Sequence, residues 1–537
     1  MKPIQQTFLA FAASALVGIA LRSRDLFVVD GATRCLTVFQ NPTLLFHPNN
    51  HLLYPVNVLV WTRIASAMGF NLSQPLNFVL AVATMNCLAA AVCIAILFRI
   101  ILHLTTSWKL AATVCLAYGL TTAFLAQALN SNEPMVGAAW SFLGILFAIL
   151  ALRNRKLWPI ILSGLLFALA MATYRSMVFL APAAAVILIS SAGAAKLSRA
   201  GQLVRLATLG VSFIAGCAAI FGWAYSHMGV SRANMFAKFL RQEDSSAYFD
   251  ASPLQLVKLP LGLTRDCFPI LPGFNGMRGF LNGPKSVFIL VTLLVFALWF
   301  CLFFCAYTLA KRWTSLHPLE RTAVPVSLVG LLFTMIPILT WNPFYGKFWI
   351  QPLACISVLV AIAFRQFSLA SRPVLIACRI AALLFLLGVS FNLAWAIPNH
   401  FHRAFEFEEA RKVTQFVGDK DFVVLDRGAD SVSVLYANLW ADESHFLPLM
   451  DVACVAGNSG PQKVDDAIRR TRAVGGKVFF LGLLDLPKLT WDVFLGAHCG
   501  VPYERFDRYR SAAHLRAQFQ GRTGAVSLWE LEFPSSQ

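Results

Sequence analysis

Long apolar runs separated by short polar segments constrain this chain more than any other feature. A transmembrane helix needs about 20 apolar residues, and fewer where short hairpins are buried among neighbours. Only 13% of the 537 residues are charged, whereas a soluble domain carries about 25%. We therefore predict a polytopic α-helical membrane protein with about 11 transmembrane helices, at residues 7–21, 76–102, 110–129, 135–152, 157–173, 177–191, 203–225, 286–310, 322–340, 352–364 and 379–397.

Acidic residues divide the chain into two parts. Residues 1–398 contain eight Asp or Glu and residues 399–537 contain eighteen. The first part is predicted to be the transmembrane domain and the second a small soluble α/β domain. In the second part, the stretch VDDAIRRTRAVGGKVFFLGL predicts a helix ended by Gly-Gly and then a buried strand. Asp426 and Asp430 follow an earlier predicted strand and are interpreted as loop acids rather than a ligand site.

Basic residues indicate the orientation in the membrane. Short loops rich in Lys and Arg stay in the cytoplasm, and such clusters fall in loops of one parity, for example Lys311 and Arg312. We expect a multi-pass protein of the cell membrane with a cytoplasmic N-terminus and an extracytoplasmic C-terminal domain. The net charge of +18 thus belongs to membrane topology, and no nucleic-acid partner is expected.

The outer face carries nearly all the acids of the transmembrane part. Seven of its eight carboxylates fall outside by this topology, and the eighth, Glu320, is cytoplasmic. None lies deep within a span, where a proton- or ion-coupled transporter usually carries such groups. This absence favours chemistry at the outer surface over coupled transport.

The first outer loop contains Asp30 and Arg34, followed by His47, His51 and Tyr54. Residues 43–69 mix apolar and polar positions in a pattern typical of a helix lying in the membrane interface. The two histidines are four residues apart, a spacing that suits a metal on one helical face. The intervening Pro and Asn residues favour a turn and no third ligand is evident, so no metal and no cofactor are expected.

Three further outer turns carry candidate residues. Glu133 lies in NSNEP, before Pro134, where a carboxylate either caps the next helix or acts in a site. Two other turns each place an aromatic residue beside a cation, Tyr174 with Arg175 and Tyr345 with Lys347. Each cation either extends to lipid headgroups or binds a phosphate.

Four cysteines, Cys35, Cys267, Cys454 and Cys499, are predicted to face the outside. Disulfides such as Cys454 with Cys499 or Cys35 with Cys267 are one interpretation in an oxidising compartment, and buried thiols are the other.

Taken together, these features resemble the GT-C class of integral-membrane glycosyltransferases, in particular the protein mannosyltransferase-like and aminoarabinose transferase-like branch. The resemblance covers residues 1–398 and is carried by Asp30 in VVDGATR, Glu133 in NSNEP, the Tyr174-Arg175 turn, and Tyr345-x-Lys347 before an apolar run with Pro352. Gly follows Asp30 where many relatives have a second acid, and Lys347 stands where Arg is common.

The resemblance implies an inverting transfer of a sugar from a polyprenyl-phosphate donor to an acceptor hydroxyl on the outer face. Such a reaction needs a base for the hydroxyl and positive charge for the leaving phosphate. We assign Asp30 as the base and Glu133 as a second catalytic group. The remaining assignments are donor phosphate binding by Arg175, Lys347, Tyr345 and Tyr174, and substrate binding by Arg34, His47, His51 and Tyr54. The acceptor, whether lipid, polysaccharide or protein, stays open. A transporter or flippase of a lipid-linked sugar and a non-catalytic scaffold are the alternatives.

Overall fold

The computed structural model describes most of the chain. The described residues are 2–22, 29–40, 52–154, 156–190, 198–227, 252–268, 285–341, 343, 345–367, 372–401, 409, 411–418, 420–425, 446–449, 460–492, 501–521 and 524–532.

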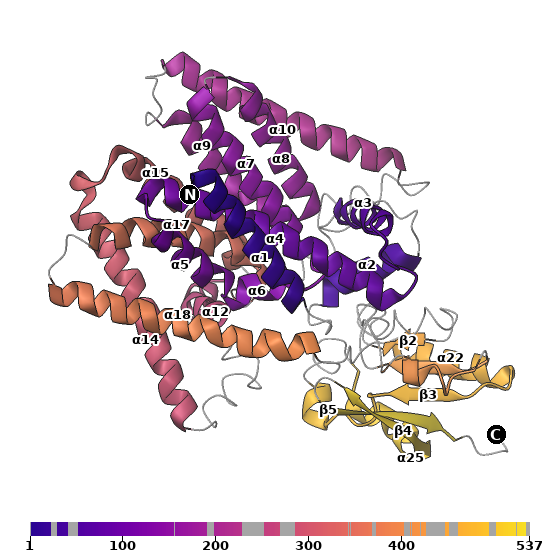
Figure 1. Cartoon of the computed structure of the whole chain (residues 1–537). Coiled ribbons are helices and arrows are strands. Elements are labelled where there is room, and N and C mark those ends of the chain that lie inside the picture. The colour runs from indigo at the N-terminus through magenta and orange to yellow at the C-terminus, as the bar shows by residue number, and fades with distance from the viewer. Residues whose placement is uncertain are drawn as a thin grey trace. The chain divides into compact units, whose positions relative to one another are not determined.

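The chain forms two compact units, drawn in Figure 1. The first, here called the helical unit, comprises residues 1–23, 43–69 and 80–400. The second, here called the sheet unit, comprises residues 401–537 together with two earlier segments, 24–42 and 70–79. In the sheet unit the helix α2, Val29–Gln40, packs on the start of α4, where the rings of Phe39 and Phe78 lie 5.2 Å apart.

The helical unit consists of helices throughout its described residues. They are α1 (Pro3–Leu21), α3 (Tyr54–Ala67), α4 (Pro75–Thr105), α5 (Trp108–Gly119), α6 (Thr122–Ala128), α7 (Pro134–Asn154), α8 (Trp158–Thr173), η1 (Arg175–Leu180), α9 (Ala181–Ile189), α10 (Arg199–His227), α12 (Leu254–Cys267), α14 (Lys285–Lys311), η3 (Trp313–Ser315), α15 (Pro318–Thr334), α16 (Ile336–Thr340), η4 (Gly346–Phe348), α17 (Ile350–Phe367) and α18 (Arg372–Phe401).

Seven helices among the described residues are long and apolar enough to cross a membrane, or eight if one bent pair counts as a single span. Three shorter apolar helices accompany them: Trp158–Thr173, Arg175–Ile189 and Arg379–Leu393. Every predicted span thus coincides with helical structure, and the polytopic helical architecture is confirmed. The count of eleven is not, because several spans are short.

One predicted span, residues 110–129, is broken. Its two halves, α5 and α6, meet at an angle of 75°. Thr121 Oγ1 donates to the carbonyl oxygen of Tyr118 at 2.7 Å, and Asn392 Nδ2 donates to that of Leu120 at 2.6 Å. Because side chains satisfy the carbonyls that the break exposes, the chain can turn here without leaving buried polar groups unpaired.

Polar contacts also stabilise the opposite end of the helices. Glu320, only 1% exposed, lies in the first turn of α15, and its carboxylate accepts hydrogen bonds from Arg365 at 2.9 Å and from Gln366 at 3.1 Å. Arg365 also donates to the carbonyl oxygen of Leu104 at 2.7 Å. The carboxylate is therefore buried with its counter-charge.

A five-stranded mixed sheet forms the core of the sheet unit. The strand order is β2-β1-β3-β5-β4, in which β1 (Phe422–Leu425) pairs in parallel with β2 (Phe446–Pro448) and β3 (Val478–Leu481). The strands β4 (Ala513–Gly521) and β5 (Gly524–Leu531) complete it in antiparallel pairing. The predicted helix, Gly-Gly and strand are confirmed as α22 (Gly460–Ala473), Gly475 to Gly476, and β3.

The turn between α22 and β3 requires glycine. A Cβ atom on Gly476 would lie 1.8 Å from the carbonyl oxygen of Lys420, which is backbone and has no room to move. We predict that Gly476→Ala costs about 2 kcal/mol or more in the free energy of unfolding of the sheet unit. The readout is limited proteolysis of the full chain, with cleavage in residues 401–537 appearing at a lower temperature. Gly475→Asn is the control, because Gly475 has φ +73° with open space around it, and Asn tolerates that conformation.

Candidate active site

A polar turn is buried inside the helical unit. Its four residues, Asn130, Ser131, Asn132 and Glu133, are between 0 and 3% exposed. Asn86 of α4 donates from Nδ2 to the carbonyl oxygens of Asn130 and Asn132, the former at 2.6 Å. The backbone amide of Glu133 donates to Asn132 Oδ1 at 3.1 Å. The outer position of this turn stays a prediction, and within the fold its residues are buried.

The helix α3 supports this turn. Tyr54, its first residue, is fully buried and donates from its hydroxyl to the carbonyl oxygen of Ser131 at 2.7 Å. Asn57, one turn later, donates to Thr173 Oγ1 at 3.2 Å. The predicted interfacial segment thus contains a helix whose start is fixed to the polar turn and to the end of α8. We infer that Tyr54 positions the turn that carries Glu133.

Two aromatic-cation turns that are distant in the sequence converge. The Lys347 ammonium lies 5.9 Å from the centre of the Tyr174 ring and 5.5 Å from the centre of the Tyr345 ring. These distances are typical of cation-π contacts. Tyr174 ends α8, and Arg175 follows it as the first residue of η1. The structure therefore gathers Tyr174, Tyr345 and Lys347 in one cluster. Arg175 adjoins it in the sequence, and these four residues predicted to hold a phosphate are here called the cationic cluster.

Hydrogen bonds from the neighbouring helices hold the Lys347 turn in place. Gln351 Nε2 donates to Ser141 Oγ at 2.9 Å and to the carbonyl oxygen of Met177 at 2.8 Å. The buried Trp349 donates from Nε1 to the carbonyl oxygen of Pro343 at 2.8 Å. These bonds join the start of α17 to α7 and η1, so the Lys347 and Tyr174 turns share one rigid frame.

Asp266 is a candidate that the sequence did not single out. It lies near the end of α12, is 4% exposed, and its Oδ2 accepts no hydrogen bond from the described residues. A Cβ atom on Gly346, between Tyr345 and Lys347, would lie 3.0 Å from Asp266 Oδ1. Burial raises the pKa of Asp266 well above its ordinary value, against a smaller opposing effect of Arg265. A buried carboxyl group of this kind beside a cationic cluster is typical of functional sites. No sequence motif marks Asp266, and its contact with Gly346 in the folded protein is what identifies it.

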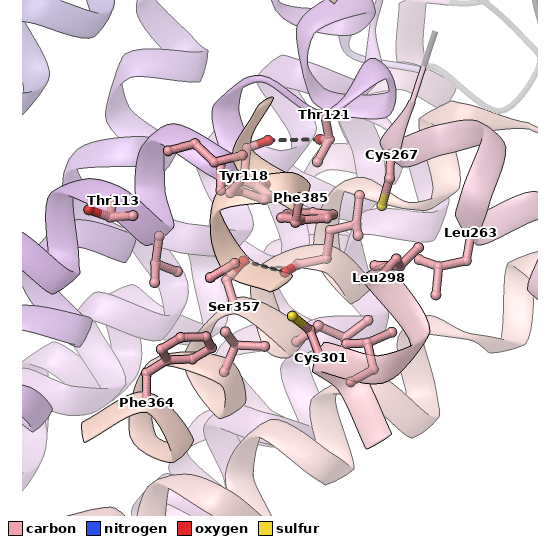
Figure 2. A pocket seen from close by; sticks show the side chains of 18 of the residues that line it. Thr113, Tyr118, Thr121, Leu263, Cys267, Leu298, Cys301, Ser357, Phe364 and Phe385 are labelled. Carbon is pink, nitrogen blue, oxygen red and sulfur yellow. Dashed lines mark hydrogen bonds between the residues drawn. The ribbon is translucent and has the colours of Figure 1, made fainter. Parts of the chain in front are cut away.

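An apolar cavity of about 120 Å³ begins next to Asp266. Figure 2 shows its wall running from Cys267 and Leu263 past Leu298 and Cys301 to Phe364. The lining hydroxyls of Thr121 and Ser357 donate to backbone carbonyls, each at 2.7 Å, and so leave the wall apolar. The cavity, here called the α12 cavity, suits a hydrocarbon chain. Cys267 is a buried free thiol, so the buried-thiol interpretation applies to it.

The other predicted residues belong to the sheet unit or lie outside the described residues. Asp30 and Arg34 lie on α2 in the sheet unit, where a helix replaces the expected loop, and only their backbone is described. His47, His51, Cys454 and Cys499, together with Asp426 and Asp430 of the C-terminal part, lie outside the described residues. Within the part of the chain that the structure describes, no three His, Cys, Asp or Glu side chains gather closely enough to hold a metal ion.

Comparison with solved structures identifies the fold. The chain has the GT-C fold of integral-membrane glycosyltransferases. ArnT from Cupriavidus metallidurans in the apo state superposes with a TM-score of 0.57 at 12% sequence identity, covering 97% of each chain, and ArnT bound to undecaprenyl phosphate gives 0.54 with the same identity and coverage. The Archaeoglobus fulgidus oligosaccharyltransferase, in complex with Zn and sulfate, gives 0.50 at 11% identity, covering 97% of this chain and 72% of its own. No family model and no curated protein sequence matches the chain.

The Tyr54 hydrogen bond can be tested by removing one oxygen atom. Tyr54→Phe takes a buried donor away from the Ser131 carbonyl, so we expect a loss of about 1–3 kcal/mol in the free energy of unfolding. Thermal unfolding of the purified protein measures this loss. Tyr307→Phe, at a tyrosine that is half exposed, is the control and should leave the midpoint unchanged. Equal midpoints for the two variants would contradict the supporting role of Tyr54.

The raised pKa of Asp266 predicts a pH-dependent stability. Below the pKa of the unfolded chain the carboxyl group is protonated in both states, and burial of the neutral acid costs no ionisation energy. As the pH rises towards the pKa of the folded state, only the unfolded chain ionises, and the free energy of unfolding falls. Asp266→Asn removes this loss, so its unfolding midpoint should exceed that of the wild type by a few degrees at pH 8 and by less at pH 4. Asp492→Asn, at an exposed carboxylate, is the control. A shift of the same size at both pH values would refute this prediction.

Proposed function

We propose that the chain is a glycosyltransferase that moves a sugar from a polyprenyl-phosphate donor to an acceptor hydroxyl on the outer face of the membrane. The observation that carries the proposal is the convergence of Lys347 with Tyr174 and Tyr345, beside Arg175. The cluster lies in a fold shared with ArnT, a structure of which contains undecaprenyl phosphate. A lipid-linked phosphodiester needs fixed positive charge next to apolar walls, and the cationic cluster and the α12 cavity offer both.

The donor phosphate is assigned to the cationic cluster. Arg175 and Lys347 neutralise the negative charge that grows on the phosphate as the bond to the sugar breaks. Tyr174 and Tyr345 fix the lysine ammonium through their ring faces and offer hydroxyl groups to the phosphate oxygens. The part of the prenyl chain nearest the phosphate is assigned to the α12 cavity, whose lining is almost entirely apolar.

The transfer itself requires one proton movement. The acceptor oxygen attacks the anomeric carbon while Asp30 takes the hydroxyl proton, and the electrons of the cleaved bond between carbon and oxygen pass to the phosphate. Attack opposite the phosphate inverts the anomeric centre. Glu133 orients the sugar or the acceptor, and Arg34, His47 and His51 supply further hydrogen bonds. The acceptor is left open, and the proposed topology places the N-terminus in the cytoplasm and residues 399–537 outside.

The test measures release of polyprenyl phosphate by the purified chain from a panel of polyprenyl-phosphate sugars with candidate acceptors. Asp30→Asn should lower kcat at least about 100-fold, the effect of losing a general base. Lys347→Met should lower kcat/KM by about 10- to 100-fold, which corresponds to a charged hydrogen bond of about 1.5–3 kcal/mol. Lys109→Met, at an exposed lysine at the start of α5, is the matched control and should retain activity.

The alternatives give different results. A transporter or flippase of a lipid-linked sugar would move the donor across a vesicle membrane without an acceptor and would keep doing so after Asp30→Asn. A scaffold would release no polyprenyl phosphate from any donor and would tolerate changes at Asp30, Glu133, Arg175 and Lys347 together. Full activity of a normally folded Asp30→Asn variant would overturn the assignment of the base.

A further inference from the structure

A second and larger apolar cavity, of about 430 Å³, runs between five helices of the helical unit. We call it the α4–α15 cavity. Side chains of α4, α7, α9, α15 and α17 line it, and at one end it is closed by Leu180, Phe142 and Ala354. This end lies beneath the cationic cluster, because Leu180 ends η1, which begins at Arg175, and Ala354 follows Gln351 by three residues.

The other end of the cavity lies far from the candidate active site. The helix α4 meets the polar turn at Asn86 and reaches the cavity mouth at Arg99 and His103. At 1.5 Å per residue, these two side chains start about 20 to 25 Å further along the helix. Leu104 and Leu319 complete this end, next to the ion pair of Glu320 with Arg365. The cavity therefore opens at the end of the helices opposite the candidate active site.

The charge at this mouth is positive. Arg99 and His103 are the basic side chains among the described residues of the lining, which include no carboxylate. Glu320, the residue after Leu319 of the lining, has its charge balanced by Arg365 at 2.9 Å. Thr322 and Ser327 add hydroxyl groups on α15, and the remaining lining side chains are hydrocarbon or, at Cys355, a thiol. The α4–α15 cavity is apolar along its length and cationic at its open end. It is therefore complementary to an amphiphile with an anionic head group.

We propose that the α4–α15 cavity is a binding site for an anionic phospholipid from the leaflet opposite the candidate active site. An acyl chain occupies the apolar part of the α4–α15 cavity, and the phosphate group binds to Arg99 and His103. Arg99 supplies a guanidinium that pairs with a phosphate oxygen in a fixed geometry. The bound lipid fills space between helices that the protein leaves unfilled beneath the cationic cluster, so it stabilises the frame that holds η1 and α17. This site is separate from the one proposed for the donor.

The experiment titrates the full-length protein in neutral detergent with dioleoyl phosphatidylglycerol and counts bound lipids by native mass spectrometry. We expect one tightly bound molecule, and Arg99→Gln should weaken its binding roughly fivefold, the effect of about 1 kcal/mol per basic residue. Lys109→Gln, at the same end of the helices but outside the cavity lining, is the matched control and should bind normally.

A second variant tests whether an acyl chain occupies the α4–α15 cavity, without altering the charge of the protein. Ala323 lines the cavity and is half-buried, so Ala323→Phe should abolish the tight binding while the unfolding temperature is maintained or raised. Equal binding of phosphatidylcholine, or an unchanged affinity in Arg99→Gln, would overturn the proposal. Displacement of the phospholipid by polyprenyl phosphate would also overturn the proposal, because the α4–α15 cavity would then be part of the donor-binding site. That result would leave the proposed glycosyl transfer intact.

Discussion

The buried polar turn at residues 130–133 depends on hydrogen bonds supplied by the protein itself. The backbone of a buried non-helical segment has no access to bulk water, so neighbouring side chains must satisfy it. Asn86 binds two carbonyls of the turn and Tyr54 a third. The arrangement around Glu133 follows from this requirement, because the residues that satisfy the turn also fix α3, α4 and α7 relative to one another. The carboxylate is thereby given a fixed place within an apolar bundle.

Separation of polar and apolar functions is the second organising feature. The cationic cluster gathers charge from two turns, while the lining of the α12 cavity is almost entirely apolar. Asp266 lies between them. Burial removes water from its carboxyl group and so raises the pKa of Asp266. Such a group is retained in a fold only where the surrounding packing outweighs its cost. The contact of α12 with Gly346 and the hydrogen bond from Asn392 to the carbonyl oxygen of Cys267 supply that packing.

The sequence predicted the helices well and their mutual contacts poorly. Apolar runs and Pro134 located helices such as α7, and the helix with Gly-Gly located α22 and β3, because these signals are local. The break between α5 and α6 was missed, since residues 110–129 are mostly apolar and Gly119, Thr121 and Thr122 were not read as a break. The partner that allows the break, Asn392, lies about 270 positions away. The cluster of Tyr174 and Lys347 was predicted by analogy with a family, and its geometry comes from packing. Asp266 was missed for the same reason: only tertiary structure brings it to Gly346.

Asn392 has a mechanical consequence for α18. Its amide nitrogen donates to the carbonyl oxygens of Leu120 and Cys267, while its amide oxygen accepts from Thr122. The helix α18 also supplies Phe385 and Leu386 to the wall of the α12 cavity. Sliding of α18 along its own axis would break these three hydrogen bonds at once, whereas a rotamer change of Phe385 or Leu386 would break none of them. Asn392 therefore fixes the register of α18 beside the cavity, so the wall can adapt through the rotamers of Phe385 and Leu386 rather than through movement of the helix.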